Sequence, residues 1–130
     1  MTQRVAKEIK RKYPLSKYVC YPDPAGRANS THSMMSDHDI LRQEKFIIKA
    51  PKKAPSITDS VNSVNKAMEF TTIDKRCRGL IRDLEQVSNK DGTRQIDKTN
   101  PELTHFSDGF RYAVHYLYPV RKPITKSFMA

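Results

Sequence analysis

Only two clear apolar strands stand among the helical segments of this chain, and this shortage limits the folds open to it. Residues 17–21 (KYVCY) and 45–50 (KFIIKA) have the β-branched and aromatic composition of buried strands, and residues 71–76 (TTIDKR) could form a brief third one. Because helical segments separate the strands, the strands should pair in parallel. We therefore expect an α/β fold with a short, mostly parallel sheet, flanking helices and an open sheet edge.

Five segments have the apolar spacing of amphipathic helices. In the first, Val5, Ile9 and Tyr13 recur every four residues and should form its inward stripe. Ser56 is placed to cap the third helix, because its hydroxyl can accept a hydrogen bond from the first helical turn. The expected helices cover residues 3–13, 33–43, 57–68, 77–87 and 104–118.

At 130 residues the chain is long enough for one domain or a piece of one. We assign residues 1–121 to this domain portion and residues 122–130 to a flexible tail. Residues 88–101 are rich in turn-forming residues and should form a small hairpin across Asp91 and Gly92.

A surplus of positive charge points to a polyanionic partner. The chain has 24 Lys and Arg against 14 Asp and Glu, which gives a net charge of +10. Such a surplus favours nucleic acid through charge neutralisation and counterion release. We find no apolar run of membrane-spanning length and no basic amphipathic helix with a large apolar face, so we do not expect a membrane partner. The alternative is a soluble domain that happens to be basic.

The cysteines and the N-terminus indicate a reducing compartment. Cys20 and Cys77 are far apart, each in an apolar context, and neither belongs to a CxxC pair, so we expect buried free thiols. The first residues lack the apolar core of a signal peptide. A cytoplasmic location is the expectation.

Asp23 is a candidate metal ligand because of its place after a strand. It lies between two prolines in YPDPAG (21–26), and sites gather at the carboxyl ends of strands in open α/β sheets. The rigid Pro-Asp-Pro would hold the carboxylate still. The alternative is a turn aspartate that satisfies local backbone donors.

His105 and Asp108 form a second candidate pair, one helical turn apart in THFSDGFRYAVHYLYPVR (104–121). With Thr104 as the N-cap, both side chains would leave the same flank of the last helix and could reach one metal or one water. The alternative is that Asp108 has no ligand and lies in the first helical turn only because the positive end of the helix dipole stabilises a negative charge there.

The remaining acidic residues are expected on solvated helix faces or in turns, including Asp83 and the Asp37-His38-Asp39 cluster. The sequence contains no GxxxxGKS phosphate loop, no GxSxG motif and no zinc-ligand spacing. These absences argue against an ATPase, a serine hydrolase of the GxSxG type and a zinc site.

Five motifs in order resemble the C-terminal nuclease domain of tailed-phage terminase large subunits, over about Ser16 to Tyr118. They read YPDPAG, SDHDILRQEKFIIKAP, SITDSVNSVNKAM, IDKRCRGLIRDLE and IDKTNPELTHFSDGFRYAV. The resemblance implies a partial ribonuclease H-like fold and endonucleolytic cleavage of concatemeric double-stranded DNA during packaging, in the host cell cytoplasm. The ATPase domain, the first strands of the sheet and the first metal aspartate of the family have no counterpart in this sequence.

The resemblance also implies roles for single residues. Asp23 and Asp108 match metal-binding aspartates for Mg²⁺ or Mn²⁺, and His105 matches a histidine that some members carry before the last helix. Gly109 replaces the alanine that often follows the helix aspartate. The implied protein partners are the rest of the terminase large subunit, the small terminase subunit and the portal.

Lysine and arginine side chains near these motifs are the candidate DNA contacts: Lys52, Lys53, Lys98 and Arg111. Arg111 could instead pair with a nearby acid. Two carboxylates seldom hold two metals, so a non-catalytic module that binds DNA or docks on packaging proteins is the alternative function.

Overall fold

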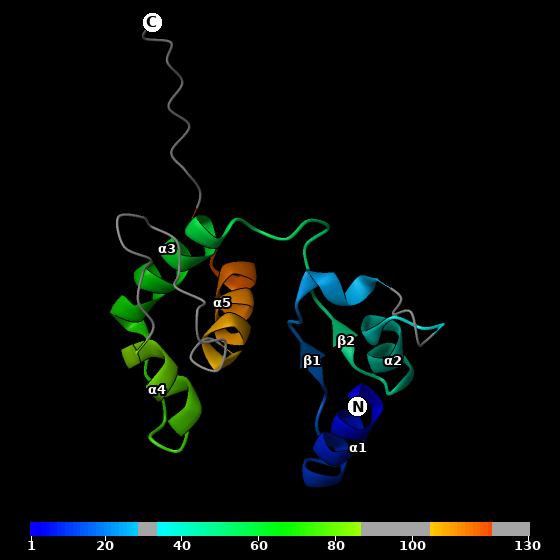
Figure 1. Cartoon of the computed structure of the whole chain (residues 1–130). Helices are drawn as coiled ribbons and strands as arrows, with labels where there is room; N and C mark the ends of the chain where they lie inside the picture. The colour runs from blue at the N-terminus through cyan, green and yellow to red at the C-terminus, as the bar shows by residue number, and fades with distance from the viewer. Residues whose placement is uncertain (29–33, 87–104, 121–130) are drawn as a thin grey trace, which may run out of the picture. The chain divides into compact units, whose positions relative to one another are not determined.

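A computed structural model describes residues 1–28, 34–86 and 105–120 of the chain (Figure 1). Within these residues it is a mixed α/β structure with five α-helices and a two-stranded parallel sheet. The chain divides into two compact units, Met1–Pro55 and Ser56–Ala130. The expected hairpin over 88–101 and the expected tail over 122–130 lie outside the described residues.

The first unit contains the whole sheet. Its elements are α1 (Thr2–Lys12), β1 (Val19–Cys20), a 3-10 helix η1 (Pro24–Arg27), α2 (Asp37–Gln43) and β2 (Ile47–Ile48). The strands pair in parallel, with Val19 opposite Ile47 and Cys20 opposite Ile48. The expected parallel pairing is confirmed, although each strand is only two residues long.

The inward stripe expected for α1 is wrong. Val5 and Ile9 are 49% and 36% exposed, and Ala6 is the residue of α1 that is fully buried. Polar bonds tie α1 to the α2 region: Thr2 Oγ1 donates to Asp37 at 2.7 Å, and Lys10 Nζ lies 3.3 Å from Glu44. A small residue at the contact lets the two helices approach closely enough for these bonds, which explains why Ala6 is buried and the larger side chains are not.

A Schellman-type turn connects α2 to β2. The Phe46 N–H donates to the Leu41 carbonyl at 3.0 Å, and the Lys45 N–H donates to the Arg42 carbonyl at 3.0 Å. Lys45 has a φ of 68°, in the left-handed region that favours glycine. Phe46 follows this turn directly. It is buried and stacks on Tyr18 with ring centroids 5.0 Å apart.

The left-handed conformation at Lys45 leads to a stability prediction. Lys45→Gly should raise the free energy of unfolding by up to about 1 kcal/mol, because glycine removes the steric penalty of positive φ. Lys45→Val should lower it, since a β-branched side chain is worst in this region. Thermal melts followed by circular dichroism measure both, and equal melting temperatures for the three proteins would contradict the strained turn.

The described part of the second unit consists of helices, and the first of them begins at the N-cap expected from the sequence. It contains α3 (Ile57–Ala67), a 3-10 helix η2 (Met68–Phe70), α4 (Arg78–Gln86) and α5 (His105–Leu117), and α5 packs against both α3 and α4. The Ser56 hydroxyl accepts the Asp59 N–H at 3.0 Å, which confirms the predicted N-cap. The apolar core among the described residues is Val64, Ala67 and Val114, with Phe110 packed against it.

The brief strand expected over 71–76 is wrong. These residues form an irregular segment that ends in a turn. The Asp74 carboxylate accepts the Arg76 backbone N–H at 2.8 Å and also bonds the Arg76 guanidinium, which lowers the pKa of Asp74. An aspartate that satisfies its own turn competes with strand pairing.

The cysteines differ from each other. Cys20 on β1 is partly buried, and this burial raises the pKa of its thiol. Cys77 is exposed, so the expectation of two buried thiols is wrong for this residue. The reason is local: α4 begins one residue later, at Arg78, and Cys77 belongs to the turn before the helix.

Candidate functional site

Asp108 is held in a fixed position at the start of α5. Its Oδ1 accepts a hydrogen bond from Arg111 at 3.0 Å, one helical turn along. The other end of the guanidinium donates to Ser60 Oγ on α3 at 2.7 Å. Arg111 is 5% exposed, whereas the Asp108 side chain is 20% exposed. A buried arginine therefore anchors a carboxylate that is partly exposed.

Ser60 is suited to this anchoring role because its own hydroxyl is already placed. It is fully buried, and its Oγ also donates to backbone carbonyls of the preceding turn of α3, at 3.0 Å to Ser56 and 2.9 Å to Ile57. One turn further along α3, Ser63 Oγ lies 2.7 Å from His115 Nδ1 of α5. Two small serines thus let α3 and α5 approach closely along a polar seam.

The N-terminus of α5 is fixed by Asp83 of α4. Asp83 Oδ2 accepts the backbone N–H groups of Phe106 at 2.8 Å and Ser107 at 3.2 Å. Its Oδ1 lies 3.2 Å from Arg82. These bonds satisfy donors that the first turn of a helix leaves open. Asp83 therefore fixes the position of the first turn of α5, which carries Asp108.

The expectation that Asp83 lies on a solvated face is wrong, because the residue is completely buried. The signal in the sequence was weak. Asp83 falls three residues after Leu80, at the border of the apolar stripe that Leu80, Ile81 and Leu84 form, so helical spacing alone does not predict its burial. A buried carboxylate needs hydrogen-bond donors, and α5 supplies them.

Gly79 lets the N-terminal turn of α5 reach α4. A Cβ at position 79 would lie 2.5 Å from the nearest atom of the Phe106 ring. Any larger residue would force the partly exposed Phe106 ring to shift.

Asp23 caps a short turn in the first unit. Its Oδ1 accepts the Ala25 N–H at 2.9 Å, which is the turn role left open as an alternative. Its carbonyl oxygen lies 2.9 Å from His38 Nε2, and a Cβ at Gly26 would be 2.8 Å from the same ring. The Asp23 side chain stays exposed, while its backbone is fixed by His38.

His38 is 1% exposed, so the surface position expected for the Asp37-His38-Asp39 cluster is wrong for the histidine. It is right for the two aspartates, which are exposed. Successive helical residues point in different directions, and α2 turns its histidine towards η1. His38 is thus a support of the Asp23 turn that the sequence reasoning missed.

The other candidate residues have separate places. The His105 side chain is exposed and makes no hydrogen bond with any residue that the structure describes. Lys52 and Lys53 are exposed on the loop before α3, and Arg27 donates to the Lys52 carbonyl at 2.7 Å. Lys98 lies outside the described residues. Of the two roles left open for Arg111, the structure shows the pairing with an acid.

The described residues do not by themselves fit a complete divalent-metal site. Asp23 belongs to the first unit and Asp108 to the second. Over residues 1–28, 34–86 and 105–120, no three His, Cys, Asp or Glu side chains are grouped so that they could hold a metal ion. Mg²⁺ and Mn²⁺ sites for hydrolysis need several oxygen ligands. We therefore derive no chemical step through a metal.

None of the described helices is both long and apolar enough to cross a membrane. Comparison of the chain with protein-family models, with curated proteins and with solved structures finds no match.

Proposed function

We propose that this chain takes part in metal-dependent endonucleolytic cleavage of double-stranded DNA, as the C-terminal part of a nuclease domain of the terminase large-subunit type. The observation that carries the proposal is the support of Asp108. A partly exposed carboxylate is fixed by a buried arginine, and the first turn of the helix that carries it is bound by a buried aspartate. Catalytic ligands are typically held by such supporting residues.

The proposed roles follow the candidate residues. Asp108 and Asp23 would be carboxylate ligands for Mg²⁺ or Mn²⁺, and His105, exposed one turn before Asp108, would orient a ligand or a water. Two carboxylates can hold one divalent ion together with water and substrate phosphate oxygens, so the proposal expects cleavage by this chain, which further acidic ligands from the rest of a nuclease domain would increase. The net charge of +10 supports DNA as the substrate, with Lys52, Lys53 and Lys98 as phosphate contacts.

The wider setting belongs to the same proposal. β1 and β2 are only two residues long. In a ribonuclease H-like sheet, additional strands from the rest of the nuclease domain would pair beside them and complete the sheet. The other partners would be the remaining large subunit, the small terminase subunit and the portal, in the cytoplasm of an infected host cell.

A second candidate function is a non-catalytic module that binds DNA or docks on packaging proteins. The observation that favours it is the absence of a three-ligand group among the residues that the structure describes. The ion pair between Asp108 and Arg111 is compatible with a purely structural role for this carboxylate.

Plasmid nicking by a matched pair of variants tests the proposal. With Mn²⁺ present, Asp108→Ala should lose at least about 100-fold in nicking rate, which corresponds to roughly 3 kcal/mol of transition-state stabilisation. Glu85→Ala removes one acidic charge from an exposed position in the same unit and should nick like the unchanged chain. Nicking that survives in folded Asp108→Ala would contradict the role of Asp108.

A further inference from the structure

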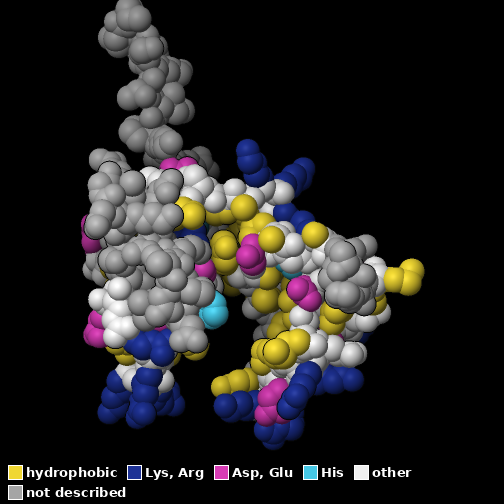
Figure 2. Space-filling view, viewed as in Figure 1, with side chains coloured by type: hydrophobic (Ala, Val, Ile, Leu, Met, Phe, Trp, Pro, Cys, Tyr) yellow, Lys and Arg dark blue, Asp and Glu magenta, His cyan; other side chains and the backbone are white. Residues whose placement is uncertain are grey.

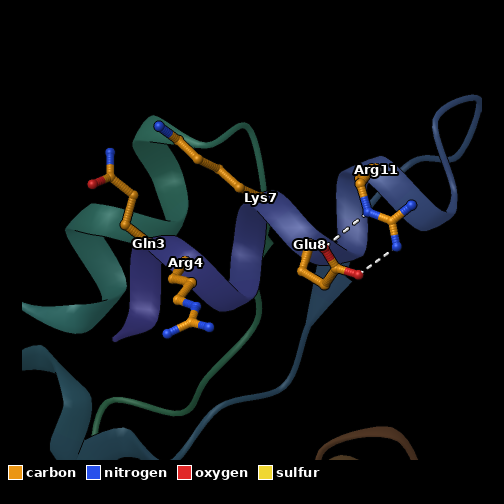
Figure 3. A pocket seen from close by; sticks show the side chains of 5 residues that line it. All are labelled: Gln3, Arg4, Lys7, Glu8 and Arg11. Atoms are coloured by element: carbon orange, nitrogen blue, oxygen red, sulfur yellow. Dashed lines mark hydrogen bonds and ion pairs between the residues drawn. The ribbon is translucent and has the colours of Figure 1, made fainter.

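The basic face of α1 is a surface that the proposed function does not use. It is formed by Arg4, Lys7 and Arg11, and these side chains line a shallow pocket together with Gln3 and Glu8 (Figure 3). At 100° per residue the three basic side chains fall within a sector of about 60° around the helix. All three are exposed. Figure 2 shows Lys and Arg side chains gathered over this part of the first unit.

Two of these cations are available for a ligand. Arg11 is already bonded to Glu8, at 2.9 and 2.6 Å, and this pair lowers the pKa of Glu8. The side chains of Arg4 and Lys7, by contrast, form no hydrogen bond or ion pair with any residue in the described parts of the chain. Lys7 has only a longer-range electrostatic interaction with Glu44, so both side chains can still bond a ligand on a surface that is already strongly positive.

The positive charge of the chain is concentrated in the same unit. Residues 1–55 contain twelve Lys and Arg against five Asp and Glu, a net charge of +7 out of +10 for the whole chain. Within α1 itself, five basic residues stand against one acid. Such a field attracts a polyanion over a long range and raises its association rate.

We propose that α1 lies along the phosphate backbone of duplex DNA, with Arg4 and Lys7 as its principal phosphate contacts. An α-helix of eleven residues spans about 16 Å, and one strand of B-DNA presents a phosphate about every 3.4 Å of axis. The helix can thus follow several phosphates of one strand. This inference rests on the DNA-binding part of the proposed function.

An anionic membrane offers the same charge, and the composition of α1 argues against it. A helix that inserts into a lipid surface typically presents large apolar side chains such as Trp, Phe or Leu. α1 contains none of these; its large apolar residues are Val5 and Ile9, which are only partly exposed at 49% and 36%. The basic face lies on the other side of the helix from Val5 and Ile9. A phosphate backbone needs only charge and hydrogen-bond donors there.

The test is duplex binding by the whole chain and two matched double variants. The probe is a fluorescein-labelled duplex followed by anisotropy at several salt concentrations. Arg4→Gln/Lys7→Gln should raise Kd roughly tenfold and lower the salt slope by about 2, because two phosphate contacts are lost. Lys75→Gln/Arg78→Gln removes the same charge from exposed positions in the second unit and should change Kd less than about threefold.

The outcomes separate this inference from the nuclease proposal. Equal weakening by both double variants, or no weakening by Arg4→Gln/Lys7→Gln, would overturn the role of α1 even if nicking is observed. Loss of binding specific to Arg4→Gln/Lys7→Gln would support it even if the chain never nicks DNA. Binding to phosphatidylserine vesicles that depends on Arg4 and Lys7, without duplex binding, would also overturn it. Circular dichroism checks that all variants remain folded.

Discussion

Replacing Asp83 by alanine should destabilise the second unit by about 2–4 kcal/mol. The buried carboxylate accepts the backbone N–H groups of Phe106 and Ser107, and alanine would remove both of these part-buried hydrogen bonds at the start of α5. A lost helix cap costs about 1 kcal/mol, and an unsatisfied buried donor costs about 1–3 kcal/mol more. Urea unfolding followed by circular dichroism measures the change.

Two further variants make this result specific. Asp83→Asn keeps a side-chain oxygen that can accept from the same N–H groups, so it should lose less than half as much stability as Asp83→Ala. Glu85→Ala changes an exposed acid two residues away and should stay within about 0.5 kcal/mol of the unchanged chain. A midpoint for Asp83→Ala equal to that of Glu85→Ala would show that Asp83 does not seat α5.

Replacing Arg111 by alanine should have the second large effect, a loss of about 3 kcal/mol. The guanidinium links Asp108 to Ser60, so its removal takes away the ion pair of a partly buried carboxylate and opens a cavity between α3 and α5. The Nε atom of Arg111 is buried without a partner among the described residues, which keeps the loss at the lower end for a buried pair.

The geometry of the guanidinium makes a conservative variant informative. Arg111→Lys keeps the charge but cannot reach both Asp108 and Ser60 with a rigid fork, so it should recover only part of the stability. Arg78→Ala removes an exposed arginine of the same unit and should be nearly neutral. If Arg111→Ala unfolds at the same urea concentration as Arg78→Ala, Arg111 does not anchor Asp108.

The sequence predicts those parts of the fold that depend on local rules. Ser56 caps α3 because its hydroxyl is one residue before an apolar helical stripe. The parallel pairing of β1 and β2 follows from a helix that lies between two apolar segments. Both features are encoded within a few residues, so spacing and residue type are enough to identify them.

Features that depend on contacts between elements were missed. The large apolar residues of α1 are exposed because α1 meets its neighbour through Ala6, and helical spacing alone cannot tell which side of a helix meets a partner. Asp83 and His38 were assigned to the surface because charged and polar residues usually lie there. Each is buried against an element distant in sequence, the start of α5 and the turn of Asp23 respectively.

The candidate site was predicted in part. The position of Asp108 in the first turn of the last helix follows from the sequence and agrees with the structure. Its anchoring by Arg111 and Ser60 depends on how α3 packs against α5, and the sequence left the role of Arg111 open between DNA and an acid. Whether Asp23 and Asp108 act on one metal stays a prediction.

Cleavage of supercoiled plasmid by the purified chain is the most direct test of the central claim, that Asp23 and Asp108 serve metal-dependent DNA cleavage. The chain and a folded Asp23→Ala/Asp108→Ala variant should be compared side by side with Mn²⁺, with Mg²⁺ and with EDTA. The account predicts nicking by the unchanged chain that requires the metal and is lost in the variant. Nicking that persists in EDTA or in the double variant, or a folded chain that never nicks, would contradict it.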